Sequence, residues 1–299
     1  MKENTSSLTA EATTAFRAIE SMRPQSERVC NDWLARKFVR GRFLMLGHSR
    51  VLANAAYRQM IKQGMGPVYG EVVGRTRYFD DLLAARVADG LEQLVIMGAG
   101  FDTRAYRFHD LLRGARVFEV DHPSTRELKL ERVAAALGSV PDDVVYVPAD
   151  LDSEDPGEPL IDRGYDPGAV TLFILEGVIM YLQPDSVDRV LRFMARGSGP
   201  GSTIAFNYLD ASVLKDESKF EGASQSREVL KRWGELPAFA LAADEVHLFL
   251  SERGFDNVEQ VTSRDLREKY FLPLGRGDKV ASHLGIVSAR NRLNATQGV

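Results

Sequence analysis

The feature that most constrains the fold is an alternation, from residue 91 onward, of short apolar runs with helix-like segments. The runs are too apolar to have a solvated face, and the first four each end in or beside a glycine or a carboxylate. The segments between them carry helix signals, such as Pro123 near a start and Gly138 just past an end. Buried strands alternating with helices predict a mostly parallel sheet covered on both faces. The runs lie at 91–98, 114–121, 143–151, 169–177, 202–210 and 280–290.

The first 90 residues have a different texture. Apolar residues recur at helical spacing in the segments 9–22, 33–39 and 78–88, while glycines and a proline interrupt the stretch 64–70. We expect residues 1–90 to form a helical cover that belongs to the same domain as a core at 91–299. Further helices are predicted at 184–196 and 241–254, and the polar stretch 211–240 is interpreted as an insertion.

Composition narrows the class of protein. The 299 residues carry a formal charge of −4, which gives no basic footprint for nucleic acid. The five histidines and the single cysteine, Cys30, form no cluster with zinc-like spacing, so no metal is expected. The most apolar window, 170–182, is too short to span a bilayer, and the polar N-terminus does not resemble a signal peptide. We expect a cytoplasmic enzyme without nucleic-acid or membrane partners.

The first run ends in Gly98-Ala99-Gly100, which is followed by Phe-Asp-Thr-Arg. Glycines directly after a buried strand let the backbone turn tightly and approach a ligand closely. An ordinary strand-to-helix turn is the alternative. Thr103 stands where dinucleotide-binding loops have a third glycine, and this argues against a nicotinamide or flavin cofactor.

The next three runs end in acidic residues. Asp121 ends the second run, where a carboxylate can accept hydrogen bonds from both ribose hydroxyls of an adenosine; its alternative role is to cap the following helix. Asp150 and Leu151 end the third run, placed to contact an adenine ring, although a solvated aspartate is common at such a position. Glu176-Gly177 ends the fourth, where a buried carboxylate needs a partner. Together, the four strand ends predict a site for an adenosine-bearing cofactor.

The motifs GAGFDTRAYRF, FEVDHP, ADL and LEGVIMYL resemble those of the leucine carboxyl methyltransferase family. The resemblance is greatest to its bacterial branch of S-adenosylmethionine-dependent O-methyltransferases, which includes polyketide-tailoring enzymes. It covers most of the chain, from about residue 75 to the C-terminus, together with a less distinctive helical N-terminus. It implies a class I methyltransferase (Rossmann-like) fold of the α/β class, with a mostly parallel seven-stranded sheet and an N-terminal helical cover, and S-adenosyl-L-methionine as the cofactor.

The resemblance also implies roles for individual residues. The glycine loop would line the cofactor, Asp121 would bind the ribose with His122 beside it, and Glu176-Gly177 would lie near the methionine moiety. An arginine of GRTRYFD would meet the cofactor carboxylate; both Arg75 and Arg77 are candidates, and Arg77 is favoured. The cofactor-binding residues expected are therefore Arg77, Gly98, Ala99, Gly100, Asp121, His122, Asp150, Leu151, Glu176 and Gly177.

The methyl acceptor and any general base are harder to predict. Tyr181 follows the fourth apolar run, and Tyr208 lies at the end of the fifth. Their rings are better candidates for the walls of a substrate pocket than the histidines are. His48 could face either the substrate or solvent, His122 suits a helix start, and His283 is expected in the core. No residue is identified as catalytic.

Several functions stay open at this point. The favoured one is an S-adenosyl-L-methionine-dependent O-methyltransferase acting on a hydroxyl or carboxyl of a small molecule, such as a polyketide-like metabolite. The alternatives are a methyltransferase of a protein C-terminal carboxyl, a nicotinamide-dependent oxidoreductase, and a cofactor-binding module without turnover. The sequence leaves the acceptor and the oligomeric state undetermined.

Overall fold

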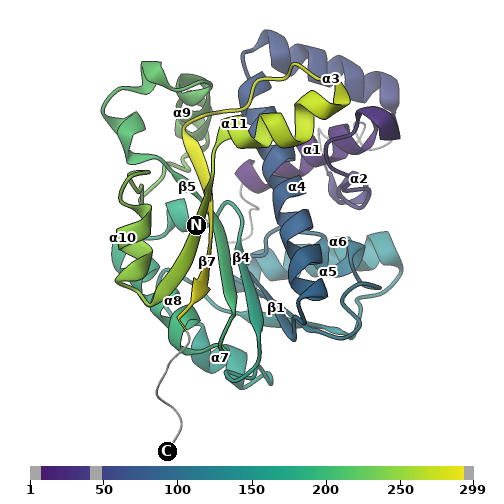
Figure 1. Ribbon diagram of the computed structural model, residues 1–299. Helices are drawn as coiled ribbons and strands as arrows, with labels where there is room; N and C mark the ends of the chain where they lie inside the picture. Colours follow the sequence, from purple (N-terminus) through teal and green to yellow (C-terminus); the bar gives the residue numbers. More distant parts are fainter. Residues whose placement is uncertain (1–7, 41–48, 293–299) are drawn as a thin grey trace, which may run out of the picture.

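The fold is seen in a computed structural model, which describes residues 8–40 and 49–292 (Figure 1). Seven strands form one sheet in the order β3-β2-β1-β4-β5-β7-β6. All pairs from β3 to β5 are parallel, whereas β7 runs antiparallel to both β5 and β6. The expected mostly parallel seven-stranded sheet is confirmed. The strands are β1 (Gln93–Met97), β2 (Arg116–Asp121), β3 (Val144–Pro148), β4 (Thr171–Leu175), β5 (Thr203–Leu209), β6 (Phe255–Val261) and β7 (Leu284–Asn291).

The last part of the sheet differs from the sequence prediction. Strand β6 was missed because its residues, FDNVEQV, are mostly polar, as an edge strand with one partner allows. The antiparallel direction of β7 was not predicted either. The helix expected at 241–254 is shorter, because Leu241 forms an isolated bridge with Asp210 before α10 (Val246–Ser251) begins.

Helices cover both faces of the sheet, as expected from the apolar strands. Figure 1 shows α8 and α10 on one side of the sheet, and α4 and α5 on the other. Successive side chains of a strand point to opposite faces of the sheet. Ile96 and Ile174 therefore belong to the core on the α4 side, whereas Val95 and Phe173 belong to the core on the α8 side. The helices after β1 are α5 (Arg104–Arg107), α6 (Pro123–Leu137), α7 (Gly157–Ile161), α8 (Pro184–Arg196), α9 (Ala223–Trp233), α10 and α11 (Ser263–Leu266).

The helical cover consists of α1 (Leu8–Ser21), α2 (Ala35–Phe38), α3 (Arg50–Lys62) and α4 (Gly66–Ala88). Helix α4 is longer than predicted, because it continues through Pro67 and Gly70, which the sequence analysis took as interruptions. The proline occupies the first turn, where its missing N–H costs nothing. A Cβ at Gly70 would lie 2.2 Å from the carbonyl oxygen of Lys279, so glycine is needed for this close approach. The glycine therefore serves packing and does not break the helix.

The stretch 211–240 leaves the carboxyl end of β5 and returns to it. It contains the short helical turns η4 (Ala211–Leu214) and η5 (Glu217–Lys219), followed by α9. The amide of Leu241 donates to the carbonyl of Leu209, which closes the excursion at 2.9 Å. Within the described ranges, no helix has the length and apolar character needed to cross a bilayer.

Candidate cofactor and acceptor site

The glycine loop turns sharply at the end of β1. Gly98 and Gly100 both have positive φ, at 63° and 43°, a region that L-residues rarely adopt. A Cβ on Gly98 would also lie 2.5 Å from Cγ2 of Val178. The amide of Ala99 donates to the carbonyl of Val120, which ties the loop to the end of β2. The loop is thus held tightly against both neighbouring strand ends.

Asp121 lies next to this loop at the end of β2. Its carboxylate accepts from the backbone amides of Gly100, at 2.5 Å, and of His122, at 2.7 Å. Burial raises the pKa of Asp121, and these two amide donors oppose the rise. His122 caps α6: its Nδ1 accepts from the amide of Ser124, and its side chain is exposed. Asp121 is therefore half-buried beside the loop, and His122 faces solvent next to it.

The third strand end is more open. Asp150 is half-buried, and its carboxylate accepts from the amide of Asp152 at 3.0 Å, an arrangement that shapes the turn after β3. Leu151 is buried in the core on the α8 side. These two residues lie at the same edge of the sheet as Asp121, because the carboxyl ends of parallel strands share one edge.

Glu176, at the end of β4, forms ion pairs with two arginines. Its carboxylate lies 2.9 Å from Nε of Arg75 and 2.7 Å from Nη1 of Arg104. Burial would raise the pKa of Glu176, but the two guanidiniums outweigh burial and lower it. Arg104 is fully buried and also pairs with Asp102 and with Asp80. Glu176 is consequently ionised and fixed in position.

The expected arginine, Arg77, is not at this site. Its side chain is 45% exposed, pairs with Asp81 at 2.7 Å and donates to the carbonyl of Val29. Residues two apart on a helix are turned by about 200° from each other. Arg75 therefore faces the strand ends, at 8% exposure, while Arg77 faces away. This geometry favours Arg75 over Arg77 as the candidate for a cofactor carboxylate, and the contact itself stays a prediction.

Asn207 is a site residue that sequence reasoning missed. It is fully buried in β5, and its Oδ1 accepts from the amide of Gly177 at 2.6 Å. Gly177 has a φ of 71°, so this bond holds a turn that favours glycine. Within residues 8–40 and 49–292, Nδ2 of Asn207 has no hydrogen-bond partner. The sequence does contain a sign of this residue, because an amide side chain within a mostly apolar strand needs a polar partner.

The two tyrosines have different positions. Tyr181 ends η3 (Ile179–Tyr181), and the charges of Glu235, Arg75 and Glu71 all act on its pKa, which burial raises most strongly. Tyr208 faces the other side of the sheet, where its hydroxyl donates to Gln260 at 2.8 Å. Tyr181 therefore lies near the strand ends. That Tyr208 walls a substrate pocket stays a prediction.

The three histidines considered as general bases also differ in position. His48 lies outside the described residues. His122 is at the helix start, as favoured from the sequence. His283 is buried just before β7, on the far side of β5 from Glu176.

A network of charged side chains extends from Glu176 into the helical cover. Each neighbouring pair lies within 3.4 Å, and all members are largely buried. With every group ionised, five carboxylates and four guanidiniums leave one negative charge. Its members are Asp32, Glu71, Asp80, Asp102, Glu176, Arg17, Arg75, Arg104 and Arg107.

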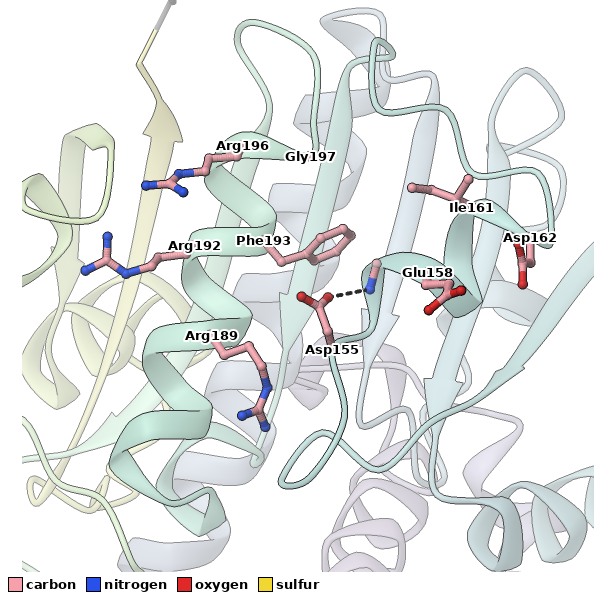
Figure 2. A pocket seen from close by; sticks show the side chains of 10 residues that line it. Asp155, Glu158, Ile161, Asp162, Arg189, Arg192, Phe193, Arg196 and Gly197 are labelled. Carbon is pink, nitrogen blue, oxygen red and sulfur yellow. Dashed lines mark hydrogen bonds between the residues drawn. The ribbon is translucent and has the colours of Figure 1, made fainter.

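A separate hollow of about 700 Å³ lies between α7 and α8. Figure 2 shows Arg189, Arg192 and Arg196 along one side of α8, with Asp155 and Glu158 across from them. None of the expected cofactor or substrate residues lines it. Among the residues with a described position, no group of His, Cys, Asp or Glu is arranged to hold a metal ion.

Comparison with known proteins identifies relatives. The profile of the leucine carboxyl methyltransferase family matches residues 10–195. A protein of a Parafrankia species is 37% identical over 211 residues, which are 70% of this chain and 64% of its own length. A protein of Mycolicibacterium smegmatis is 40% identical over 160 residues, which are 53% of each chain. Both are named for an inferred S-adenosyl-L-methionine-dependent methyltransferase activity. The matches thus span about half to two thirds of these relatives.

Proposed function

Because the chain belongs to the leucine carboxyl methyltransferase family, we propose that it binds S-adenosyl-L-methionine and transfers its methyl group to a hydroxyl or carboxyl oxygen of a small molecule. The observation that carries the proposal is the position of Glu176. It lies between Arg75 and Arg104 at the same sheet edge as the glycine loop and Asp121. Ligands of open α/β sheets bind outside this edge.

The residues present fit this cofactor. The network of net charge −1 complements a molecule whose sulfonium, ammonium and carboxylate sum to +1. Asp121 retains lone pairs for ribose hydroxyls beyond its two amide bonds, and Glu176 can accept from the ammonium. Arg75 can meet the carboxylate, and the unpartnered Nδ2 of Asn207 supplies a further buried donor there. An orphaned donor at a buried strand end favours a ligand acceptor.

When bound, the cofactor supplies a methyl group already activated by its sulfonium sulfur. The protein then has to hold the acceptor oxygen in line with that methyl group and to exclude water. A carboxylate acceptor needs no base, whereas a phenol gains from one. The buried Arg75 and Arg104 keep Glu176 ionised, so that it orients the ammonium end and does not exchange protons.

The alternatives have weaker support. A nicotinamide cofactor requires close approach of the helix after the glycine loop, but Thr103 is buried there and its Oγ1 accepts from Arg107 at 2.8 Å. The alternative acceptor is the C-terminal carboxyl group of a protein. The alternative to an enzyme is a module that binds the cofactor without turnover. We propose the cytoplasm as the location, on the strength of the lone cysteine, Cys30.

Calorimetric titration with S-adenosyl-L-methionine and S-adenosylhomocysteine tests the cofactor. We expect both to bind, NADH not to bind, and Asp121→Ala to weaken binding by about 1–3 kcal/mol because amide donors and ribose hydroxyls lose their acceptor. Asp256→Ala, on the exposed part of β6, is the matched control. Failure of both ligands to bind the intact wild type would refute the proposal.

Labelled methyl transfer then tests the acceptor class. Phenols, small carboxylates and a peptide ending in leucine are compared as substrates. Turnover of the phenols or carboxylates supports the proposal. Turnover of the peptide alone would instead support a protein methyltransferase. Cofactor binding without turnover of any substrate would support a cofactor-binding module.

A further inference from the structure

The excursion 211–240 borders a second cavity, of about 630 Å³, beyond the carboxyl end of β5. This volume is typical of a site for a small molecule. Most of its walls are apolar, and the strongly exposed Leu214 and Leu236, at 73% and 55%, extend this apolar lining to the surface. Arg227, which also lines it, is paired with Glu217 at 2.6 Å. The apolar lining includes Leu214, Leu230, Leu236, Ala238 and Phe239.

His283 is the buried polar side chain of this cavity. It is 3% exposed, and neither Nδ1 nor Nε2 has a hydrogen-bond partner in the described part of the chain. Its backbone is fixed, because its carbonyl accepts from the amide of Asp210 at 2.9 Å. Buried polar groups are nearly always hydrogen-bonded. The Glu221 backbone acts on one side of the ring, which leaves the other ring nitrogen for a missing partner.

The cavity wall is hydrogen-bonded to η3, the turn that follows the end of β4. The amides of Ala238 and Phe239, in the cavity wall, both donate to the carbonyl of Met180, at 2.8 and 3.0 Å. Met180 is four residues beyond Glu176. The next residue, Tyr181, senses the charges of both Glu235 and Arg75. One short segment is therefore hydrogen-bonded to the cavity wall at Met180 and lies within electrostatic range of Arg75 at Tyr181.

We propose that this cavity holds the methyl acceptor, and that the acceptor is a ring-bearing apolar molecule whose hydroxyl group hydrogen-bonds to His283. The inference rests on the proposed methyl transfer, and it narrows the acceptor from hydroxyl or carboxyl to hydroxyl. Apolar walls suit rings, and one buried unpaired side chain suits one polar group. Burial lowers the pKa of His283, although the Glu221 backbone opposes this, so the ring is neutral at pH 7 and pairs with a hydroxyl as donor or acceptor.

Binding of 2-naphthol and of naphthalene to the full-length protein tests this inference. With histidine ring nitrogens labelled, the five histidines give few signals, and His283→Phe assigns the relevant one. We expect 2-naphthol to shift the His283 ring signals and to bind about five- to tenfold more tightly than naphthalene. His283→Phe abolishes this preference, whereas the control His247→Phe, exposed on α10, retains it.

Leu230→Trp provides a second test that leaves His283 in place. The larger ring takes up part of the cavity beside the probe, so we expect both probes to bind more weakly while S-adenosylhomocysteine still binds. Equal affinity of the wild type for the two probes, no binding of 2-naphthol, or an unshifted His283 signal would overturn the inference. Absence of S-adenosylhomocysteine binding from the wild type would instead overturn the proposed methyl transfer, whatever the probes show.

Discussion

Arg75 and Arg77 are separated by one residue on α4, yet their surroundings are opposite. Arg75 is buried against Glu71 and Glu176, and Arg77 lies at the surface with Asp81. The difference follows from helix geometry, since the helix turns by about 100° per residue. At this scale, the direction of a single side chain decides whether it belongs to the site.

The two arginines form a matched pair for mutation. Arg75→Lys keeps the charge but loses the planar fork that bonds to two carboxylates. We expect it to raise the Kd for S-adenosylhomocysteine about tenfold or more, or about 1.4 kcal/mol. Arg77→Lys should change the Kd by less than about twofold, because exposed pairs contribute little. Calorimetry measures both, and equal effects would contradict the assignment of Arg75.

Gly98 and Gly114 form a second pair. Alanine at Gly98 must adopt a φ of 63° and meets Val178, whereas a Cβ at Gly114 meets no atom within 4 Å and its φ is not positive. We expect Gly98→Ala to lower the free energy of unfolding by about 1–3 kcal/mol. Gly114→Ala should change it by less than about 1 kcal/mol. Urea unfolding measures both, and a neutral Gly98→Ala would remove the argument for a strained loop.

At the scale of elements, β2 and α6 are joined behind the glycine loop by a buried ion pair. Nζ of Lys129 lies 2.7 Å from Glu119 and donates to the carbonyl of Ala99 at 3.4 Å. The hydroxyl of Tyr106 donates to Glu119 at 3.1 Å. The glycine loop is thus linked through Lys129 to a titratable group, Glu119. Neither the burial of Glu119 nor its partners were predicted from the sequence.

This pair predicts a dependence of stability on pH. Burial raises the pKa of Glu119 from 4.5 to about 7, with Lys129 opposing. Between these values the folded chain holds a proton that the unfolded chain has released, so the free energy of unfolding falls as pH rises through this window. We expect this component, about 1–3 kcal/mol, to be absent from Glu119→Gln. Unfolding curves of both proteins from pH 4.5 to 8 measure it; parallel profiles would contradict it.

For the whole molecule, the cover and the sheet share one core. The cluster on the α4 side joins residues of the cover, such as Phe16 and Phe79, to residues of the sheet, such as Leu94 and Ile174. Arg17 of α1 adds a buried bond of 2.9 Å to the carbonyl of Phe101, next to the glycine loop. We therefore expect the cover to unfold together with the sheet.

A bound ligand should stabilise this unit as a whole. With S-adenosylhomocysteine at one hundred times its Kd, the free energy of unfolding rises by about 2.7 kcal/mol. We expect a single thermal transition whose Tm rises by about 4–8 °C. Scanning calorimetry measures it. Two transitions, of which the ligand shifts one, would show that the cover unfolds separately.

Local patterns were sufficient for much of the fold. Apolar runs that end in Gly98, Asp121, Asp150 and Glu176 predicted the strands β1 to β4 and the edge at which their polar ends gather, because strand periodicity and burial are written into neighbouring residues. The polar edge strand β6 and the continuation of α4 through Gly70 were missed. Their reasons lie in β7 and in the carbonyl of Lys279, both distant in the chain.

The residues of the site divide in the same way. The sequence alone predicted the strand-end carboxylates and the glycine loop, since each stands next to a recognisable apolar run. Folding decided which arginine meets Glu176 and that Tyr208 faces away. It also decided that, among residues 8–40 and 49–292, no side chain pairs with Nδ2 of Asn207 or with the ring of His283. These properties depend on side-chain direction and on contacts between distant segments. A pattern of neighbouring residues does not contain them.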